Sequence, residues 1–364
     1  MNEQLHRLSQ LPLREDLQGL KPYGAPQIDV PIMLNVNENT HQLPPAVHEA
    51  IVNAVSEAVT GINRYPDREF TALRRSLAAY LGHGLLEENL WAANGSNEVL
   101  QQILQAFGGP GRTLMSFPPT YSMYPLLASA TGTQYVAGER TSDFTLTAKS
   151  AAEQVLAARP NIVILCSPNN PTGTALAPDV VEAVYQAGHA TNSIVIVDEA
   201  YEEFAHTGTP SALTLLPGRE RLIVSRTMSK AFALAGARLG YLAAAPEISD
   251  ALRLVRLPYH LSAITQATAL AALDHAPSLL ANVEDIKLQR DRIVEELERM
   301  GLSPAPSDSN FVFFGGIDNP SRVWQGLLDD GVLIRDVGIP GYLRVSAGTE
   351  AETTRFLESL RKLL

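Results

Sequence analysis

One lysine, Lys230, lies in a segment whose other residues could support amine chemistry. It follows Ser229 and precedes an apolar, glycine-containing run that leads to Arg238. A lysine that forms a Schiff base needs access to a carbonyl group and a lowered pKa, which burial and nearby cations provide. Arg226 and Arg238 are both close in sequence. The segment therefore predicts a reactive amine, whereas an isolated Ser-Lys pair would indicate a solvated surface lysine.

Three polar groups upstream could complete a site for an aromatic cofactor. The apolar run 194–197 ends in Asp198, a carboxylate that is costly to bury without a cationic partner such as a protonated pyridine nitrogen. Tyr201 could hydrogen-bond a phenolic oxygen, and Asn170 lies in the proline-bracketed loop 167–173. Taken singly, Asp198 could simply end a strand, Tyr201 could be a core residue and Asn170 could be a turn residue. Together with the lysine, they are the groups that pyridoxal phosphate requires.

The predicted phosphate site is the start of a helix at 97–107. Small residues with free backbone amides there could bind an anion, although they would equally make an ordinary N-cap. A hydroxyl and a guanidinium from the lysine segment would add to the same site. The candidate phosphate ligands are Gly95, Ser96, Asn97, Thr227, Ser229 and Arg238. Tyr121 follows a predicted strand and could stack on the pyridine ring, although an aromatic residue in that place is more often part of a core.

Short apolar runs predict the elements that position these groups. Such runs are typical of strands buried on both faces of a mainly parallel sheet, and ligands collect at the carboxyl ends of those strands. The predicted strands are Thr113–Phe117, Asn161–Cys166, Ile194–Asp198, Leu222–Ser225 and Leu239–Ala243. After about Pro246 the pattern changes to helices at Ser262–Asp274 and Ser278–Met300, strands at Asn310–Phe314, Val332–Arg335 and Tyr342–Val345, and a helix from Glu350.

This change in pattern predicts an α/β fold with two domains. We expect a large cofactor-binding domain at 46–250 and a smaller α+β domain at 251–364. An N-terminal segment, 1–45, is expected to join the smaller domain.

Composition limits the class of protein. The chain has 364 residues, a formal net charge of −11 and one cysteine. The negative charge argues against non-specific nucleic-acid binding. The cysteine, Cys166, follows an apolar run and is expected to be a buried, reduced thiol. We expect no metal site, no membrane span and no signal peptide, and therefore a cytoplasmic enzyme.

Taken in order, these motifs resemble the fold-type I pyridoxal-phosphate aminotransferases over essentially the full length. The resemblance implies a seven-stranded, mainly parallel sheet in an α/β/α sandwich. Within that group the chain is similar to the histidinol-phosphate aminotransferase family. The stretches that carry this similarity are Leu11–Glu15, Asn35–Asn39, Asn63–Asp67, Trp91–Glu98, Arg256–Ser262 and Ser309–Phe313. One departure is Thr40, where the family usually has proline, and the change could loosen that turn.

The resemblance also implies a role for each cofactor-binding residue. Lys230 would carry pyridoxal 5'-phosphate and move a proton, and Asp198 would keep the pyridine nitrogen protonated. Asn170 and Tyr201 would bind the ring oxygen, and Tyr121 would stack on the ring. The phosphate would be held by the backbone at Ser96 and Asn97, and by Ser229 and Arg238.

The remaining implied roles concern the partner subunit and the substrates. Tyr65 would reach the cofactor phosphate of the partner subunit, so the active unit would be a homodimer. Arg344 would bind a substrate α-carboxylate, and Arg335 the anionic end of histidinol phosphate, because the guanidinium fork suits both groups. Tyr23 and Asn37 would line the pocket.

The resulting hypothesis is a ping-pong transamination between L-glutamate and imidazole-acetol phosphate, giving 2-oxoglutarate and L-histidinol phosphate. An aromatic amino-acid aminotransferase is the nearest alternative, because it would use the same catalytic residues. A decarboxylase of a phosphorylated amino acid is a second. A cofactor-binding sensor fused to a DNA-binding domain is a third; the negative charge argues against it, as does the start of the aminotransferase-like pattern near Leu11.

Overall fold

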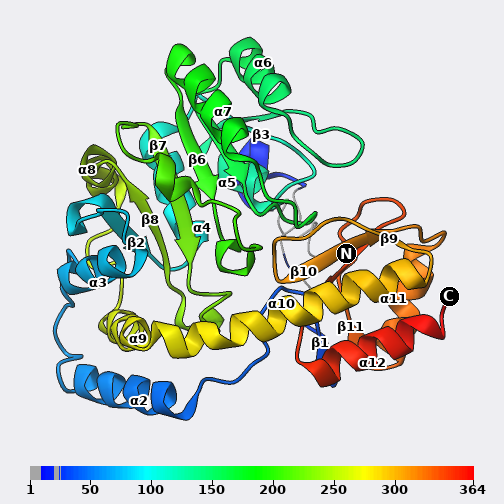
Figure 1. Cartoon of the computed structure of the whole chain (residues 1–364). Helices are drawn as coiled ribbons and strands as arrows, with labels where there is room; N and C mark the ends of the chain where they lie inside the picture. Colours follow the sequence, from blue (N-terminus) through cyan, green and yellow to red (C-terminus); the bar gives the residue numbers. More distant parts are fainter. Residues whose placement is uncertain (1–9, 20–23, 25) are drawn as a thin grey trace.

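The computed structural model describes residues 10–19, 24 and 26–364. Within these residues, seven strands form one sheet in the order β2-β8-β7-β6-β5-β3-β4 (Figure 1). Neighbouring strands are parallel, except that β8 runs antiparallel to both β2 and β7. The strands are β2 (Leu90–Ala93), β3 (Thr113–Ser116), β4 (Gln134–Ala137), β5 (Ile162–Cys166), β6 (Ile194–Asp198), β7 (Leu222–Thr227) and β8 (Gly240–Ala244). The predicted mainly parallel sheet is confirmed.

Helices cover the sheet because its central strands are apolar on both faces. Every residue of β5 and β7 is buried. Helix α4 packs against β2, β7 and β8 and against helices α5 and α8, whereas α7 packs against β6 and α6. The helices are α2 (Pro45–Thr60), α3 (Thr71–Leu81), α4 (Ser96–Phe107), α5 (Met123–Thr131), α6 (Ala148–Ala158), α7 (Pro178–Thr191) and α8 (Pro246–Val255). This arrangement is the layered α/β fold that buried parallel strands require.

A smaller sheet is built from the C-terminal part of the chain. Its central strand, β10 (Phe311–Gly315), pairs antiparallel with β9 (Ser303–Pro304) and β12 (Leu343–Ser346). Near it lie α11 (Pro320–Asp329) and α12 (Glu350–Arg361). The long helix α10 (Ala276–Arg299) runs from the side of the large sheet to the side of the small one (Figure 1).

Residues 32–34 of the N-terminal segment pair with this smaller part. Strand β1 (Ile32–Met33) pairs in parallel with β11 (Val332–Leu333), and the backbone N–H of Ser346 donates to Leu34. At the departure from the family pattern, the Thr40 hydroxyl donates to Glu352 at 2.7 Å, which ties this turn to the start of α12.

The domain boundaries at 45 and 250 stay a prediction. Helix α9 (Ala263–Asp274), which was assigned to the smaller part, packs against α2 and α3 of the larger part. The predicted strand Val332–Arg335 is shorter than expected: β11 ends at Leu333, and Arg335 forms an isolated bridge with Arg344. No helix in the described part of the chain is long and apolar enough to cross a membrane.

Candidate active site

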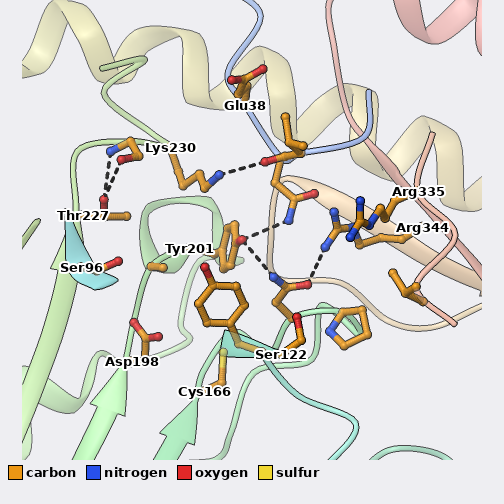
Figure 2. A pocket seen from close by; sticks show the side chains of 18 of the residues that line it. Glu38, Ser96, Ser122, Cys166, Asp198, Tyr201, Thr227, Lys230, Arg335 and Arg344 are labelled. Atoms are coloured by element: carbon orange, nitrogen blue, oxygen red, sulfur yellow. Dashed lines mark hydrogen bonds between the residues drawn. The ribbon is translucent and has the colours of Figure 1, made fainter. Parts of the chain in front are cut away.

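A cavity of about 590 Å³ opens at the carboxyl ends of β5 and β6 (Figure 2). Segments from both sheets and from the N-terminal region line it, so residues far apart in sequence meet there. Most of the predicted site residues are among those that line it: Asn37, Ser96, Asn97, Tyr121, Asn170, Asp198, Tyr201, Thr227, Ser229, Lys230, Arg238, Arg335 and Arg344. The location agrees with the rule that ligands bind beyond the carboxyl ends of parallel strands.

Lys230 points into this cavity, where its ammonium group donates to the backbone carbonyl of Val36 at 3.0 Å. Burial lowers the pKa of Lys230 to about 8, and the positive charges of Arg344 and Arg238 lower it further, against the opposing effect of Glu38. A substantial fraction of the amine is therefore uncharged near neutral pH and able to attack a carbonyl group.

The second cation expected near Lys230, Arg226, has a different role. Its guanidinium forms buried ion pairs with Glu199 at 2.8 Å and Glu203 at 3.1 Å. The proximity in sequence was misleading, because alternate residues of the strand β7 point to opposite faces of the sheet. Arg344, which is 114 positions further along the chain than Lys230, supplies the positive charge instead.

Asp198 ends β6 and is almost completely buried, at 3% exposure. Its Oδ2 accepts a hydrogen bond from the Tyr124 hydroxyl at 2.8 Å, whereas Oδ1 has no hydrogen-bond partner among the described residues. Burial raises the pKa of Asp198 to about 6, although the Tyr124 hydrogen bond opposes this shift. A buried carboxylate oxygen without a partner, facing a cavity, fits a cationic N–H donor such as a pyridinium.

Tyr124 is a site residue that the sequence analysis missed. It is fully buried on the first turn of α5, three positions after Tyr121. The spacing of three residues from Tyr121 was a weak signal, because Tyr121 lies before the helix and only Tyr124 lies within it. It was not decisive, because a tyrosine at such a position is usually part of the core.

Asn170 and Tyr201 meet in the wall of the cavity. The Tyr201 hydroxyl accepts from the side-chain amides of Asn37 at 3.0 Å and Asn170 at 3.4 Å. Arg344 in turn donates to the Asn170 side-chain oxygen at 2.6 Å. Burial raises the pKa of Tyr201 to about 12, so its hydroxyl keeps its proton and can donate it to a ligand oxygen.

The predicted phosphate site is a compact, positively charged corner. The N-terminus of α4 at Ser96 faces it, and Arg238 lies so close to Gly95 that a Cβ on that glycine would be 2.5 Å from the guanidinium. The Arg238 guanidinium is 3.5 Å from the Ser229 hydroxyl, which accepts from Thr227 at 3.0 Å. A helix N-terminus with an adjacent guanidinium and hydroxyl is suited to a phosphate group.

A glycine that the sequence analysis did not select, Gly240, allows this corner to close. A Cβ on Gly240 would overlap the backbone of Gly95 and Ser96. Only glycine therefore lets β8 approach the turn that begins α4.

The two candidate substrate arginines lie side by side across a backbone bridge. Arg335 and Arg344 exchange two backbone hydrogen bonds of 2.9 Å, and both side chains line the cavity (Figure 2). Arg344 is 7% exposed, and its guanidinium lies over the Phe311 ring at 5.1 Å from the centroid. Paired guanidinium groups in one pocket attract an anionic ligand in spite of the negative net charge of the chain.

Two described residues of the predicted site, Gly95 and Tyr65, are not among those that line the cavity. Gly95 lies directly behind it, against Arg238. Tyr65 is 80% exposed and stacks on Tyr259, with ring centroids 4.3 Å apart. Tyr23 lies outside the described residues.

The described residues give little support for thiol or metal chemistry. Cys166 is a free, buried thiol whose pKa is raised to about 12 by burial, as expected for a packing residue. In the part of the chain that the structure describes, no group of three or more His, Cys, Asp and Glu side chains could hold a metal ion.

The chain is similar to known aminotransferases over nearly its whole length. Residues 29–360 match the family model for aminotransferases of class I and II. The chain is 74% identical to histidinol-phosphate aminotransferase from Paenarthrobacter aurescens strain TC1, over 100% of this chain and 98% of that protein. It is 56% identical to histidinol-phosphate aminotransferase from Thermobifida fusca strain YX, over 97% of this chain and 95% of that protein.

The fold is also similar to a solved structure that contains a cofactor. The crystal structure of histidinol-phosphate aminotransferase from Sinorhizobium meliloti in complex with pyridoxal-5'-phosphate matches with a TM-score of 0.85 and 26% sequence identity. The match covers 97% of each chain.

Proposed function

Because this chain belongs to the class I and II aminotransferases, we propose that it transfers an amino group between L-glutamate and imidazole-acetol phosphate in histidine biosynthesis. The products are 2-oxoglutarate and L-histidinol phosphate, and the reaction is reversible. The observation that carries this proposal is the position of Lys230: its amine, with a lowered pKa, faces the same cavity as two arginines and a buried carboxylate. The names of the relatives at 74% and 56% identity support the choice of substrate.

The residues present fit pyridoxal phosphate as the cofactor. The Asp198 oxygen without a partner would accept from the pyridine N–H, and Lys230 would hold the cofactor covalently. Tyr201 and Asn170 would hydrogen-bond the ring oxygen, with Tyr121 against the ring. The phosphate would be bound by the corner made of Gly95, Ser96, Asn97, Thr227, Ser229 and Arg238.

When bound, pyridoxal phosphate supplies an electron sink that makes the proton on the amine-bearing substrate carbon acidic. The uncharged Nζ of Lys230 would remove this proton, which a group with a pKa of about 8 can do near neutral pH. The Asp198 carboxylate would stabilise positive charge at the far end of the cavity. The Tyr201 hydroxyl would donate a hydrogen bond where negative charge develops.

Arg344 and Arg335 would hold the substrates in turn. Arg344 would bind the α-carboxylate of glutamate, and Arg335 would help to bind the phosphate of histidinol phosphate. The site must accept a carboxylate donor and a phosphate-bearing partner alternately, and two adjacent guanidinium groups can serve both. Asn37, from the N-terminal segment, would orient the Tyr201 hydroxyl. The role of Tyr23 stays a prediction.

The active unit would be a homodimer. Tyr65 is exposed and is not among the residues that line the cavity of its own chain, which supports the proposal that it reaches the cofactor phosphate of the partner subunit. Exposed apolar side chains on α2 and around the Tyr259 loop support a buried contact between subunits, because large apolar side chains are unusual at a free surface in such numbers. They are Val52, Val59, Ile62, Leu254 and Leu257. The cytoplasmic location stays a prediction.

The experiment that tests this function is a visible absorption spectrum of the purified, cofactor-loaded protein. We expect the band of the lysine-bound cofactor to be lost when L-histidinol phosphate is added and restored when 2-oxoglutarate is added. A response to phenylalanine but not to histidinol phosphate would favour the aromatic alternative. Release of carbon dioxide without an amino acceptor would favour the decarboxylase. A protein that shows no cofactor band even after incubation with pyridoxal phosphate would contradict the proposal.

A further inference from the structure

Arg290, on helix α10, is a fully buried cation that is not among the residues lining the cavity. Its Nη1 donates to two backbone carbonyls, that of Phe204 at 2.8 Å and that of Ser309 at 3.3 Å. Its Nε donates to Asp291 at 2.8 Å. A buried guanidinium is costly unless it is hydrogen-bonded, so these contacts hold the segments around it firmly.

The two carbonyls lie in segments that adjoin different sheets. Phe204 ends a short 3-10 helix that follows β6 of the large sheet, whereas Ser309 lies two residues before β10 of the small sheet. One nitrogen atom therefore connects a segment next to the large sheet with a segment next to the small sheet. Deleting the side chain would leave both buried carbonyls without this donor.

Both segments lead directly to the cavity. Tyr201 precedes Phe204 by three residues, and Phe311 follows Ser309 by two. The Tyr201 and Phe311 rings pack edge to face, with centroids 5.1 Å apart, and Arg344 lies over the Phe311 ring. A change in the spacing of these two segments would therefore move Tyr201 and, through Phe311, the Arg344 guanidinium. Both Tyr201 and Arg344 line the cavity.

A histidine adds a second connection between the same segments. His206 Nε2 lies 2.8 Å from Arg290 Nη2, and its Nδ1 lies 2.8 Å from Asp308 Oδ1. A guanidinium can only donate, so Nε2 must accept and the proton must be on Nδ1, from which it is donated to Asp308. The backbone N–H of Asp308 also donates to the carbonyl of Gly173, three residues after Asn170.

We propose that Arg290 is a positioning residue for the transamination. It holds the segment that carries Tyr201 against the strand that carries Phe311, so that Arg344 is aligned with the reacting end of the cavity. Its printed contacts lie away from the phosphate corner and from Asp198, so its main effect is expected on substrate binding, with a smaller effect on the cofactor through Tyr201. This inference rests on the proposed function.

The test compares Arg290→Lys and Arg290→Gln with the wild-type holoenzyme. Three quantities are measured: cofactor affinity from the absorption band, steady-state KM and kcat for glutamate, and binding of maleate, a dicarboxylate that is not turned over, from its effect on the same band. We expect cofactor affinity within about threefold of wild type, and maleate affinity and kcat/KM for glutamate lowered about 10- to 100-fold, mainly through KM.

A purely structural role for Arg290 would lower thermal stability and cofactor affinity together and leave the KM of the folded fraction unchanged, and this result would overturn the inference. If the Arg290 variants do not fold, His206→Ala decides. Its side chain is about half exposed, so the variant should fold. It should weaken maleate binding two- to fivefold, and unchanged maleate binding would overturn the inference.

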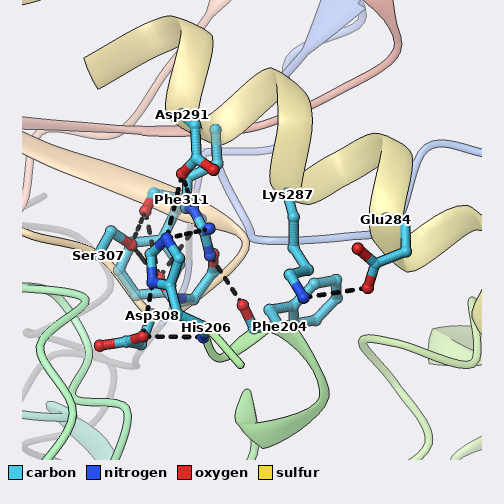
Figure 3. Close-up of polar contacts among 10 residues, drawn as sticks. Phe204, His206, Glu284, Lys287, Asp291, Ser307, Asp308 and Phe311 are labelled. Carbon is cyan, nitrogen blue, oxygen red and sulfur yellow. Dashed lines mark hydrogen bonds and ion pairs between the residues drawn. The ribbon is translucent and has the colours of Figure 1, made fainter. Parts of the chain in front are cut away.

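The matched control is Lys287→Met, on the same helix. The Lys287 ammonium pairs with Glu284 at 3.0 Å within α10 (Figure 3), and it makes no hydrogen bond to either sheet among the residues that the structure describes. It should leave maleate affinity and KM unchanged. The wild-type protein in the same titrations tests the proposed function separately. If it binds cofactor and maleate but not histidinol phosphate, the proposed substrate is wrong. The comparison of Arg290 variants remains valid in that case.

Discussion

Arg344 donates to the side-chain oxygen of Asn170 at 2.6 Å, although 174 residues separate them in the sequence. The contact joins β12 of the small sheet to the loop that follows β5 of the large sheet. The candidate carboxylate-binding arginine is therefore oriented by the same amide that approaches the Tyr201 hydroxyl, and the substrate and cofactor ends of the cavity are connected.

Replacing Arg344 with lysine should weaken glutamate binding. Lysine keeps the charge but loses the planar fork, and a charge-assisted hydrogen bond contributes about 1.5–3 kcal/mol, which corresponds to roughly 10- to 150-fold in kcat/KM. Steady-state kinetics with glutamate would measure the loss. Arg335→Lys is the matched comparison and should raise the KM for histidinol phosphate more than that for glutamate. An Arg344→Lys enzyme with the wild-type KM for glutamate would exclude the assigned role.

Asp198→Asn should stabilise the cofactor-free protein and impair the enzyme. Burial raises the folded-state pKa of this carboxyl to about 6, above its value in the unfolded chain. Ionisation of Asp198 therefore lowers the free energy of unfolding. This loss is absent below about pH 4, grows as the pH rises, and reaches its full size above about pH 6. Asparagine removes a cost on the order of 3 kcal/mol at pH 7.5.

Thermal unfolding of the two cofactor-free proteins at pH 5 and pH 7.5 would measure this effect. The Tm advantage of the asparagine variant should be larger at pH 7.5. Its turnover should nevertheless fall by orders of magnitude, because an amide oxygen does not hold a pyridinium proton as a carboxylate does. A variant that is less stable than wild type at both pH values would contradict the burial argument.

Loading of the cofactor onto the cofactor-free protein should depend on pH with a midpoint near 8. Because the pKa of Lys230 is lowered to about 8, about a quarter of the amine is uncharged at pH 7.5, whereas an ordinary lysine would be almost fully charged. The second-order rate of loading, followed by absorption, should rise from pH 6.5 to 8.5 and then level off. A rate that continues to rise tenfold per pH unit up to pH 10 would show an ordinary lysine pKa. Lys230→Ala should show neither covalent loading nor turnover.

Two inactive variants should regain activity when they are combined, if Tyr65 serves the partner subunit. A mixed dimer of Lys230→Ala and Tyr65→Ala chains contains one site with both an intact lysine and an intact tyrosine. Co-expression with two affinity tags and purification through both should give about half of the wild-type activity per dimer. The control is each variant purified alone through the same steps. A mixed dimer no more active than the better parent would place Tyr65 outside the partner's site.

The sequence was most informative where the chemistry is local. Asp198 follows four consecutive apolar residues, so both its burial and its place at a strand end could be predicted. The same holds for Asn170 and for the start of α4, because prolines and small residues restrict the backbone there. Arg226 was wrongly expected near Lys230, since distance along the chain does not tell which face of a strand a side chain occupies.

Two site residues carried no decisive signal in the sequence. Tyr124 cannot be distinguished from a core tyrosine without its contact to Asp198, and Gly240 matters only because the backbone of Ser96 packs directly against it. In both cases the function lies in a contact between elements that are far apart in sequence.

By itself, the sequence determined which reactive groups the chain contains and which of them end buried strands, because the alternation and length of apolar runs are local properties. Only the tertiary structure decided which groups meet. The cation beside Lys230, the oxygen of Asp198 without a partner and the connection through Arg290 all depend on how the two sheets pack. Their pKa values follow from the same packing, since burial and the charges brought close by folding determine the cost of ionisation.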